Sequence, residues 1–477
     1  MRDGFPFPLT PAPVPSSLNY DEAVRYLLSL GRELASPQQA SATKFGLENI
    51  RALTAHLGHP ERRYPSAHVA GTNGKGSTAA MLASILDSAG LRTGLYTSPH
   101  LARINERIRV AGREISDEDF AAAFARVRRA IEEMLASGAL AVHPTFFECV
   151  TAIAFDEFAR VAVDFAVFEV GMGGRLDATN VIEPEVAVIT QIAFDHENFL
   201  GNSIEQIAGE KAGIIKLGPW VVSAAENPEA RAVIRARAKA QSARLIEIDE
   251  SFHVKQLNSP SAREAASNSP NATRIEAIEK STGRAIELTV PLAGRFQQRN
   301  AVTALAAARL LAERGFPITD AAIARGIANV HWPGRLEHIG TRPAVYLDGA
   351  HNPAGARELL AFWDAHFAGV PIHLVYGALR DKPVDEICGL LFPRAASVIL
   401  TEPCQPRALS AAALAAMTGH LARSYEVVPD PAAAFERAIH RAAPEDAVFA
   451  TGSLYLIEDY RRGYANAHTS STQRSSK

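Results

Sequence analysis

The sequence predicts an α/β fold in which a mostly parallel sheet is covered by helices. Short apolar segments recur along the 477 residues, and longer segments with helical periodicity lie between several of them. A glycine-rich turn joins the first apolar segment directly to a helical pattern. Strands that alternate with helices are typical of parallel sheets, because parallel strands need long crossover connections.

The first half of the chain supplies the larger series of elements. We expect strands at 66–70, 92–97, 165–169, 186–191 and 220–223, and helices at 76–89, 117–136, 145–160 and 204–212. Residues 251–283 are polar and turn-rich, which predicts an exposed loop within a β-rich excursion. Regular structure resumes with a strand at 286–291 and a helix at 298–314. Ligands of such sheets bind at the carboxyl ends of the strands.

A second strand–helix series begins near residue 336, with strands expected at 344–347, 372–376, 397–400 and 447–450. The segment 332–335 places a proline beside a glycine, which is typical of a hinge. A chain of this length is also too long to fold around a single compact core. We therefore predict two domains, at 18–332 and 336–465.

Composition excludes several classes of protein. A formal charge of −3 argues against a nucleic-acid surface, and three scattered cysteines form neither a disulfide framework nor a metal-ligand pattern. The proline-rich segment 1–17 lacks the apolar core of a signal peptide, and no apolar run is long enough to span a membrane. We expect a cytoplasmic protein with no membrane or nucleic-acid partner.

The glycine-rich turn carries the most chemical information. Its residues are Gly71, Thr72, Asn73, Gly74, Lys75, Gly76 and Ser77. Between a strand and a helix, such a turn can cradle phosphates with its backbone N–H groups, and Lys75 can reach the terminal phosphates. Gly76 stands where the usual motif has a metal-binding hydroxyl, so a bound metal needs another oxygen. A glycine-rich turn alone is equally typical of an ordinary turn.

Three side chains follow successive strand ends: Ser98, Glu169 and His196. Each has an ordinary interpretation, namely a Ser–Pro turn, an acid emerging into solvent, and a satisfied histidine. Their repetition at neighbouring strand ends favours ligands for two Mg²⁺ ions around a triphosphate.

Further candidates come from a helix end and from the second half. Lys211 either complements a helix dipole or, beside metal ions, must be neutralised or made anionic. Arg335 and His351 can stabilise charge that develops during phosphoryl transfer. The turn at 347–353 can also be interpreted as a helix start, with Asn352 as its cap and Pro353 as its first position, and both interpretations can hold together.

These residues closely resemble the folylpolyglutamate synthase/dihydrofolate synthase family of the Mur ligase group, over about 20–460. The motifs GTNGKGS, TSPHL, FEVGMGGRLDATN, EKAGIIK, WPGRLE and LDGAHNP occur in the family's order. Other Mur ligases typically have Thr at the position of Gly76, so the glycine favours the folate branch. The family usually has His where this chain has Phe296, which leaves adenine contacts from that side open.

The resemblance implies an N-terminal P-loop NTPase-like domain and a smaller Rossmann-like domain. It implies that Ser98, Glu169 and His196 bind Mg²⁺ and that Lys211 is carbamylated by CO₂. It assigns Asn300 to adenine, Arg335, Asp348 and His351 to phosphates and the intermediate, and Phe147 and Asp177 to the substrate.

The implied reaction joins L-glutamate to dihydropteroate or a reduced folate with ATP, in a monomer, with Lys75, Lys211, Arg335 and His351 as catalytic residues. Two alternatives stay open at this point. One is a ligase of the same architecture acting on another carboxylate, such as a cell-wall precursor. The other is a non-catalytic nucleotide-binding protein.

Overall fold

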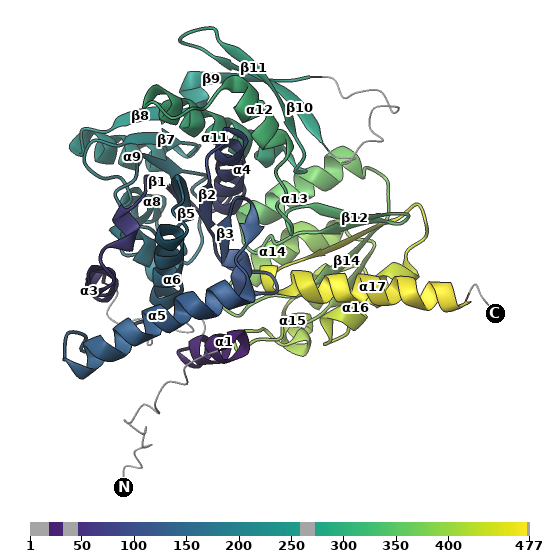
Figure 1. Cartoon of the computed structure of the whole chain (residues 1–477). Coiled ribbons are helices and arrows are strands. Elements are labelled where there is room, and N and C mark those ends of the chain that lie inside the picture. Colours follow the sequence, from purple (N-terminus) through teal and green to yellow (C-terminus); the bar gives the residue numbers. More distant parts are fainter. Residues whose placement is uncertain (1–18, 32–45, 258–271, 475–477) are drawn as a thin grey trace.

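The computed structural model describes residues 19–31, 46–257 and 272–474, and its two main sheets lie in separate halves of the chain (Figure 1). The first sheet has eight strands in the order β4-β3-β2-β5-β1-β6-β7-β8. Its six parallel strands are β1 (Ser66–Ala70), β2 (Thr93–Tyr96), β5 (Phe165–Glu169), β6 (Val186–Ile189), β7 (Trp220–Ser223) and β8 (Arg244–Glu247). The short strands β3 (Ile108–Val110) and β4 (Arg113–Glu114) add an antiparallel edge.

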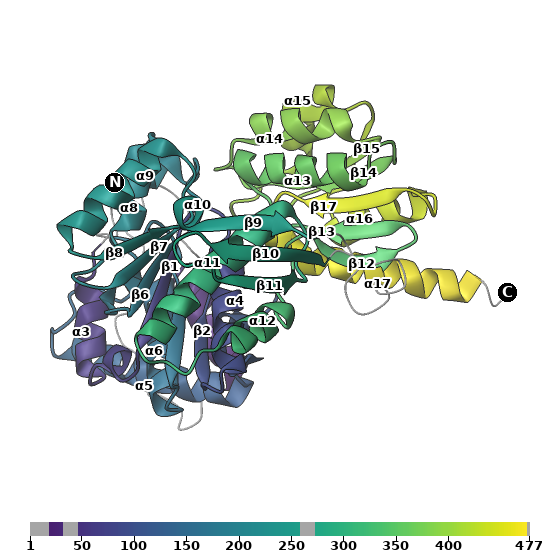
Figure 2. The same cartoon turned by 90° about the horizontal axis from the view of Figure 1, so that it is seen from above.

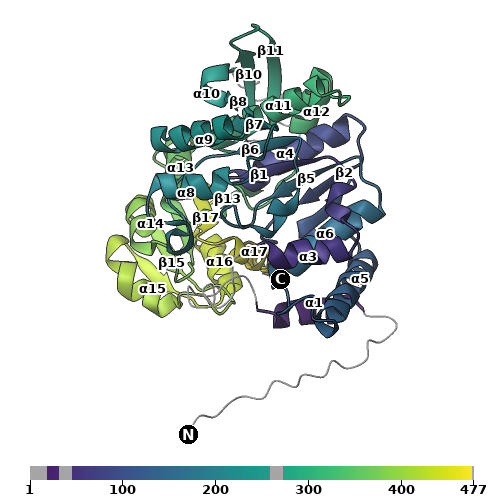
Figure 3. The same ribbon diagram turned by 90° about the vertical axis from the view of Figure 1, so that its left-hand side faces the viewer.

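Helices cover both faces of this sheet (Figure 3). Successive strand residues point to opposite faces, so Phe165 and Val167 join one apolar core while Ala166 and Phe168 join another. The first core packs against α4 (Lys75–Ser88), α11 (Arg295–Glu313) and α12 (Asp320–Ala328). The other face is covered by α1 (Tyr20–Ser29), α3 (Glu48–His56), α5 (Asp117–Ala136) and α6 (Phe146–Arg160), and near β6 and β7 by α8 (Ile204–Ala212) and α9 (Pro228–Ala240).

A small antiparallel sheet interrupts the first half, as the expected β-rich excursion requires. It has the order β11-β10-β9, with β9 (Phe252–Gln256), β10 (Thr273–Glu279) and β11 (Ala285–Val290). Ile275 and Ala277 alternate with partly exposed neighbours along β10, which is the period-2 pattern of a half-buried strand. The polar part of the expected loop, at 258–271, lies outside the described residues, as does the tail at 1–17.

The second sheet has six strands in the order β12-β13-β17-β14-β15-β16. The edge strand β12 (Glu337–Thr341) is antiparallel, and β13 (Ala344–Leu347), β14 (Ile372–Tyr376), β15 (Ser397–Leu400), β16 (Tyr425–Val427) and β17 (Ala447–Thr451) are parallel. As Figure 2 shows, α13 (Pro353–His366), α14 (Val384–Leu391) and α15 (Ala411–Thr418) cover one face, and α16 (Pro431–Arg441) and α17 (Ile457–Arg474) the other.

This architecture confirms the predicted α/β class with a second, smaller α/β unit. The expected strands are all present, most within one or two residues of their predicted ends. The domain limits 18–332 and 336–465 stay a prediction, since a sheet locates a core but not the point where a domain ends. Among the described residues, no helix combines the length and apolar character that crossing a membrane requires.

Candidate active site

A cleft of about 2140 Å³ lies between the two α/β units and is lined by residues of both. The candidates on its wall are Thr72, Asn73, Gly74, Lys75, Gly76, Ser77, Ser98, Phe147, Glu169, Asp177, His196, Asn300, Arg335, Asp348 and His351. Gly71 and Lys211 lie just behind this wall, joined by a 2.8 Å hydrogen bond from Lys211 Nζ to the Gly71 carbonyl. One cleft therefore brings together nearly every residue that the sequence singled out.

The glycine loop has a shape that side chains would disturb. A Cβ on Gly71 would lie 1.8 Å from Thr190 Oγ1, and a Cβ on Gly74, whose φ is +87°, would lie 2.4 Å from Asn300 Oδ1. Thr190 Oγ1 donates to the Asn73 carbonyl at 2.8 Å and so holds the loop against the end of β6. Because α4 begins within the loop, at Lys75, and Gly76 and Ser77 line the cleft, its first turn borders the cleft, as an anion site needs.

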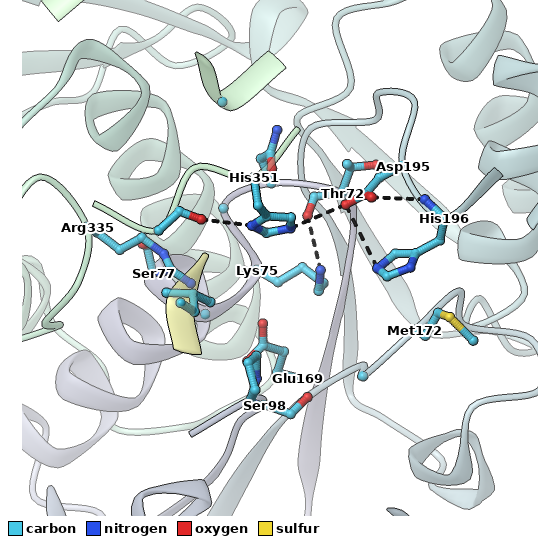
Figure 4. A pocket seen from close by; sticks show the side chains of 18 of the residues that line it. Thr72, Lys75, Ser77, Ser98, Glu169, Met172, Asp195, His196, Arg335 and His351 are labelled. Carbon is cyan, nitrogen blue, oxygen red and sulfur yellow. Dashed lines mark hydrogen bonds and ion pairs between the residues drawn. The ribbon is translucent and has the colours of Figure 1, made fainter. Parts of the chain in front are cut away.

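Lys75 curls over this loop, with Nζ donating to the Thr72 carbonyl at 3.1 Å (Figure 4). Burial lowers the pKa of Lys75, whereas the carboxylates of Glu169 and Asp195 raise it. The ammonium group is thus held against the glycine loop and beside two acids.

Ser98 and Glu169 form a pair at the ends of β2 and β5. The Ser98 N–H donates to Glu169 Oε2 at 3.0 Å, and Glu169 is only 4% exposed. Burial raises the pKa of Glu169, and the nearby Lys75 charge lowers it. Carboxylate and hydroxyl oxygens are ligands that suit Mg²⁺, and both residues line the cleft.

His196 lies apart from this pair, on the other side of Lys75 and next to Asp195 (Figure 4). Burial lowers the pKa of His196 to about 4, so its imidazole is neutral near pH 7 and keeps a lone pair for a metal. In the three described ranges, no group of three or more His, Cys, Asp or Glu is placed to hold a metal ion by itself. Mg²⁺ commonly takes one or two protein ligands and completes its shell with phosphates and water, so the donors fit ions shared with a nucleotide.

Lys211 lies in the last turn of α8 and is 4% exposed. Burial, followed by the Lys75 charge, lowers its pKa from 10.5 to about 7. A large fraction of this amine is therefore unprotonated at neutral pH, unlike an ordinary surface lysine.

The second unit contributes a turn after β13 that faces the glycine loop. Asp348 accepts hydrogen bonds from the N–H groups of Leu336 and Ala350, at 2.9 and 2.8 Å. His351 Nδ1 donates to the Gly349 carbonyl at 2.8 Å, which leaves Nε2 directed at the first unit. Arg335 lies beside this turn, and burial lowers its pKa while Asp348 and Glu169 raise it.

The two predicted substrate residues lie on the same wall as Ser98. A Cβ on Gly171 would lie 2.5 Å from Phe147 Cζ, so the ring packs directly on the glycine-rich segment after β5. Asp177 accepts from the N–H groups of Met172 and Thr179, each at 3.0 Å. Its carboxylate is therefore occupied in shaping this segment.

Asn300 reaches the glycine loop through a hydrogen-bond chain along α11. Its Nδ2 donates to Gln297 Oε1 at 2.9 Å, and Gln297 Nε2 donates to Ser77 Oγ at 3.2 Å. Phe296, at the histidine position, packs against the apolar core of the second unit while lining the cleft. The Phe296 ring thus makes an apolar contact between the units.

Sequence reasoning missed two site residues, Asp195 and Lys382, which form a 2.7 Å ion pair across the cleft. Asp195 directly precedes His196, and the same strand-end argument could have included it. Nothing in the sequence signals Lys382, because its position depends on how the units dock.

The cleft lining also includes Cys404, which is the exposed one of the three cysteines, all of which lie in the described ranges.

Comparison with known proteins identifies the family. The Mur ligase middle domain matches residues 69–308, and the Mur ligase glutamate ligase domain matches 334–454. A dihydrofolate synthase/folylpolyglutamate synthase of Bacillus subtilis is 39% identical over 421 residues, which cover 88% of this chain and 95% of that protein.

Two solved structures extend the likeness. An Escherichia coli protein in complex with DHPP and ADP has a TM-score of 0.80 and 30% identity, covering 94% of this chain and 98% of that one. A bifunctional folylpolyglutamate synthase/dihydrofolate synthase of Yersinia pestis, complexed with AMPPNP and a Mn ion, has a TM-score of 0.77 and 30% identity, with the same coverage of both chains. The chain is therefore a member of the folylpolyglutamate synthase/dihydrofolate synthase family, within the Mur ligases.

Proposed function

We propose that this chain uses ATP to join L-glutamate to dihydropteroate and to reduced folates, as a bifunctional dihydrofolate synthase and folylpolyglutamate synthase. One observation carries the proposal. The glycine loop, Lys75 and the strand-end donors of the first unit face Arg335 and His351 of the second unit across a single cleft. The names of the relatives supply the substrate class.

The chemistry requires activation of a carboxylate, whose leaving group would otherwise be oxide. Transfer of the γ-phosphoryl group to a carboxylate oxygen releases ADP and forms an acyl phosphate. The glutamate amine then attacks the carbonyl carbon, phosphate leaves, and a proton is released from the new amide nitrogen. Lys75 would bind the phosphates, and Arg335 and His351 would stabilise the charge on the transferred group.

Ser98, Glu169 and His196 would hold two divalent ions. Mg²⁺ bound there would neutralise phosphate charge during transfer. The Ser98–Glu169 pair and the neutral His196 lie on different sides of Lys75, which favours one ion at each place. Asp348 would keep the turn that carries His351 in position, and Asn300 would contact the adenine. The docked second unit would exclude water that hydrolyses the acyl phosphate.

Carbamylation of Lys211 is part of the proposal. CO₂ reacts with neutral amines, and a pKa of about 7 supplies a neutral amine at neutral pH. The carbamate would replace a cation beside Lys75 with an anion. Intact-protein mass spectrometry under bicarbonate should detect one added CO₂, which Lys211→Arg should lose. An unchanged mass together with full activity would refute this part.

For the folate substrate, we propose that Phe147 packs on the pterin and that Asp177 shapes the loop beneath it. We further propose that the protein works as a monomer in the cytoplasm, with no nucleic-acid partner.

The test is ADP release with product mass analysis. Purified protein receives ATP, Mg²⁺ and L-glutamate with dihydropteroate, tetrahydrofolate or a UDP-linked cell-wall precursor. We expect glutamate addition to both pteridine substrates and none to the UDP-linked one. Lys75→Ala and Glu169→Ala should each abolish addition while circular dichroism stays unchanged. Near-normal turnover in either variant, or turnover only with the UDP-linked substrate, would refute the assignment.

A further inference from the structure

Three side chains of the second unit converge on one carboxylate of the first. Asp195 Oδ1 accepts from Lys382 Nζ at 2.7 Å, and its Oδ2 lies 3.3 Å from Asn352 Nδ2 and 3.5 Å from His351 Nε2. These donors come from two separate loops, one after β13 and one after β14. Asp195 is thus the point at which both loops meet the first unit.

The contact is buried and extends to the glycine loop. The side chains of Asp195 and Lys382 are 8% and 5% exposed. Asn352 Nδ2 also donates to Asn73 Oδ1 at 2.9 Å, and Asn73 Nδ2 lies 3.3 Å from Asn352 Oδ1. Water and salt screen such a pair poorly, so its charges interact more strongly than those of a surface pair.

The electrostatics agree with this placement. Lys382 and Asp195 carry opposite charges 2.7 Å apart, and both side chains are buried.

We propose that Asp195 is a positioning residue: with Lys382 it docks the second unit over the glycine loop and thereby aligns His351 with the phosphates. The inference rests on the proposed function. It adds that the Asp195–Lys382 pair contributes to this alignment together with the Asn352–Asn73 bonds; among the described residues, the other hydrogen bond of the His351 ring is to the Gly349 carbonyl of its own turn. Losing the pair should allow the second unit to shift relative to Lys75.

A matched control exists on α11 and α13. Arg295 also crosses between the units, with Nε 2.9 Å from Glu358 Oε2, but its side chain is 71% exposed. Exposed pairs contribute little, so Arg295→Met should leave docking unchanged, as measured by the radius of gyration. Lys382→Met removes a charge of the same sign from the buried pair.

The experiment compares Asp195→Asn, Lys382→Met, their double variant and Arg295→Met by steady-state kinetics, AMPPNP binding and small-angle X-ray scattering with AMPPNP and Mg²⁺. Each single variant at the buried pair should lose kcat on the order of 100-fold, the cost of a misplacement near 1 Å. The AMPPNP Kd should stay within about threefold, and the radius of gyration should increase. The double variant should be no slower than the slower single variant, because both remove the same interaction.

Wild-type kcat in the single variants, or losses that multiply in the double variant, would overturn the inference. Should Lys382→Met misfold, Lys382→Arg keeps the charge and should recover part of the kcat; an inactive, folded Lys382→Arg with an unchanged radius of gyration would also overturn it. Absence of ligation in the wild type would refute the proposed function instead, and scattering and AMPPNP binding would still test docking.

Discussion

The presence of glycine at position 76 is explained by a contact with a residue far away in the sequence. A Cβ at this position would lie 3.1 Å from both Cζ2 and Nε1 of Trp332, on the hinge segment. The sequence showed only that a hydroxyl was missing after Lys75. The structure supplies a steric reason, which is that the indole covers the first turn of α4.

Gly76→Thr should therefore destabilise the fold. We expect the free energy of unfolding to fall by about 1–3 kcal/mol, the usual cost of overpacking. Gly209→Thr is the control, since that helical glycine has no atom within 4 Å of an added Cβ; its change should stay within about 0.5 kcal/mol. Chemical denaturation measures both, and equal losses would argue against the steric account.

Lys211 makes a second prediction at this scale, concerning pH. Its pKa is about 7 in the folded chain against 10.5 ordinarily, so between these values the unfolded chain binds the extra proton. Stability due to this group must then rise with pH across that window, by at most about 1.4 kcal/mol per pH unit. The unfolding free energy of the wild type minus that of Lys211→Met, measured in CO₂-free buffer, should increase as pH rises from 7 to 10. Parallel curves would show that the amine is not perturbed.

Among the elements, α13 has an N-terminal cap residue that also contacts the site. Its N-cap Asn352 accepts from the Gly355 N–H at 2.8 Å while its amide donates across the cleft. The sequence allowed a capped helix start and a functional turn together at 347–353; the cap is confirmed, and the functional role stays a prediction. Strand ends were predictable because apolar strands end where polar side chains begin, and parallel strands place those ends at one edge.

Asn352→Ala and Asn227→Ala should separate the two roles. Asn227 caps α9 away from the cleft, accepting from the Glu229 N–H at 2.8 Å. Both variants should lose about 1 kcal/mol of stability, as N-caps usually do. Only Asn352→Ala should also lose turnover, by about tenfold or more, since it alone contacts Asn73 and Asp195. A fully active Asn352→Ala would mean that the interdomain bonds are unimportant.

At the scale of the whole molecule, the two units interlock. Phe296 and Ala293 of the first unit join the apolar core of the second, and Leu101 packs against the core that includes Phe435 and Tyr460. These contacts mark what sequence could not predict. Periodicity defines each element and its edge, but the pairing of Asp195 with Lys382 depends on how two finished units dock.

Since both units border the cleft, bound nucleotide should stabilise the whole chain. At about 100 times its Kd, AMPPNP with Mg²⁺ should add about 2.7 kcal/mol to the unfolding free energy. Calorimetry should show the corresponding rise in Tm, reduced by EDTA and absent in Lys75→Met. A Tm that AMPPNP does not change in the wild type would contradict a phosphate site at the glycine loop.

Cys404 is a site at which the unmodified chain can be labelled chemically. Its thiol is exposed at the cleft mouth, whereas Cys149 and Cys388 are buried, and burial raises the pKa of Cys388 to about 12. Thiolates are the reactive form, so a maleimide dye should label Cys404 selectively without any engineered residue. Such a fluorophore would report in real time when the cleft fills and empties.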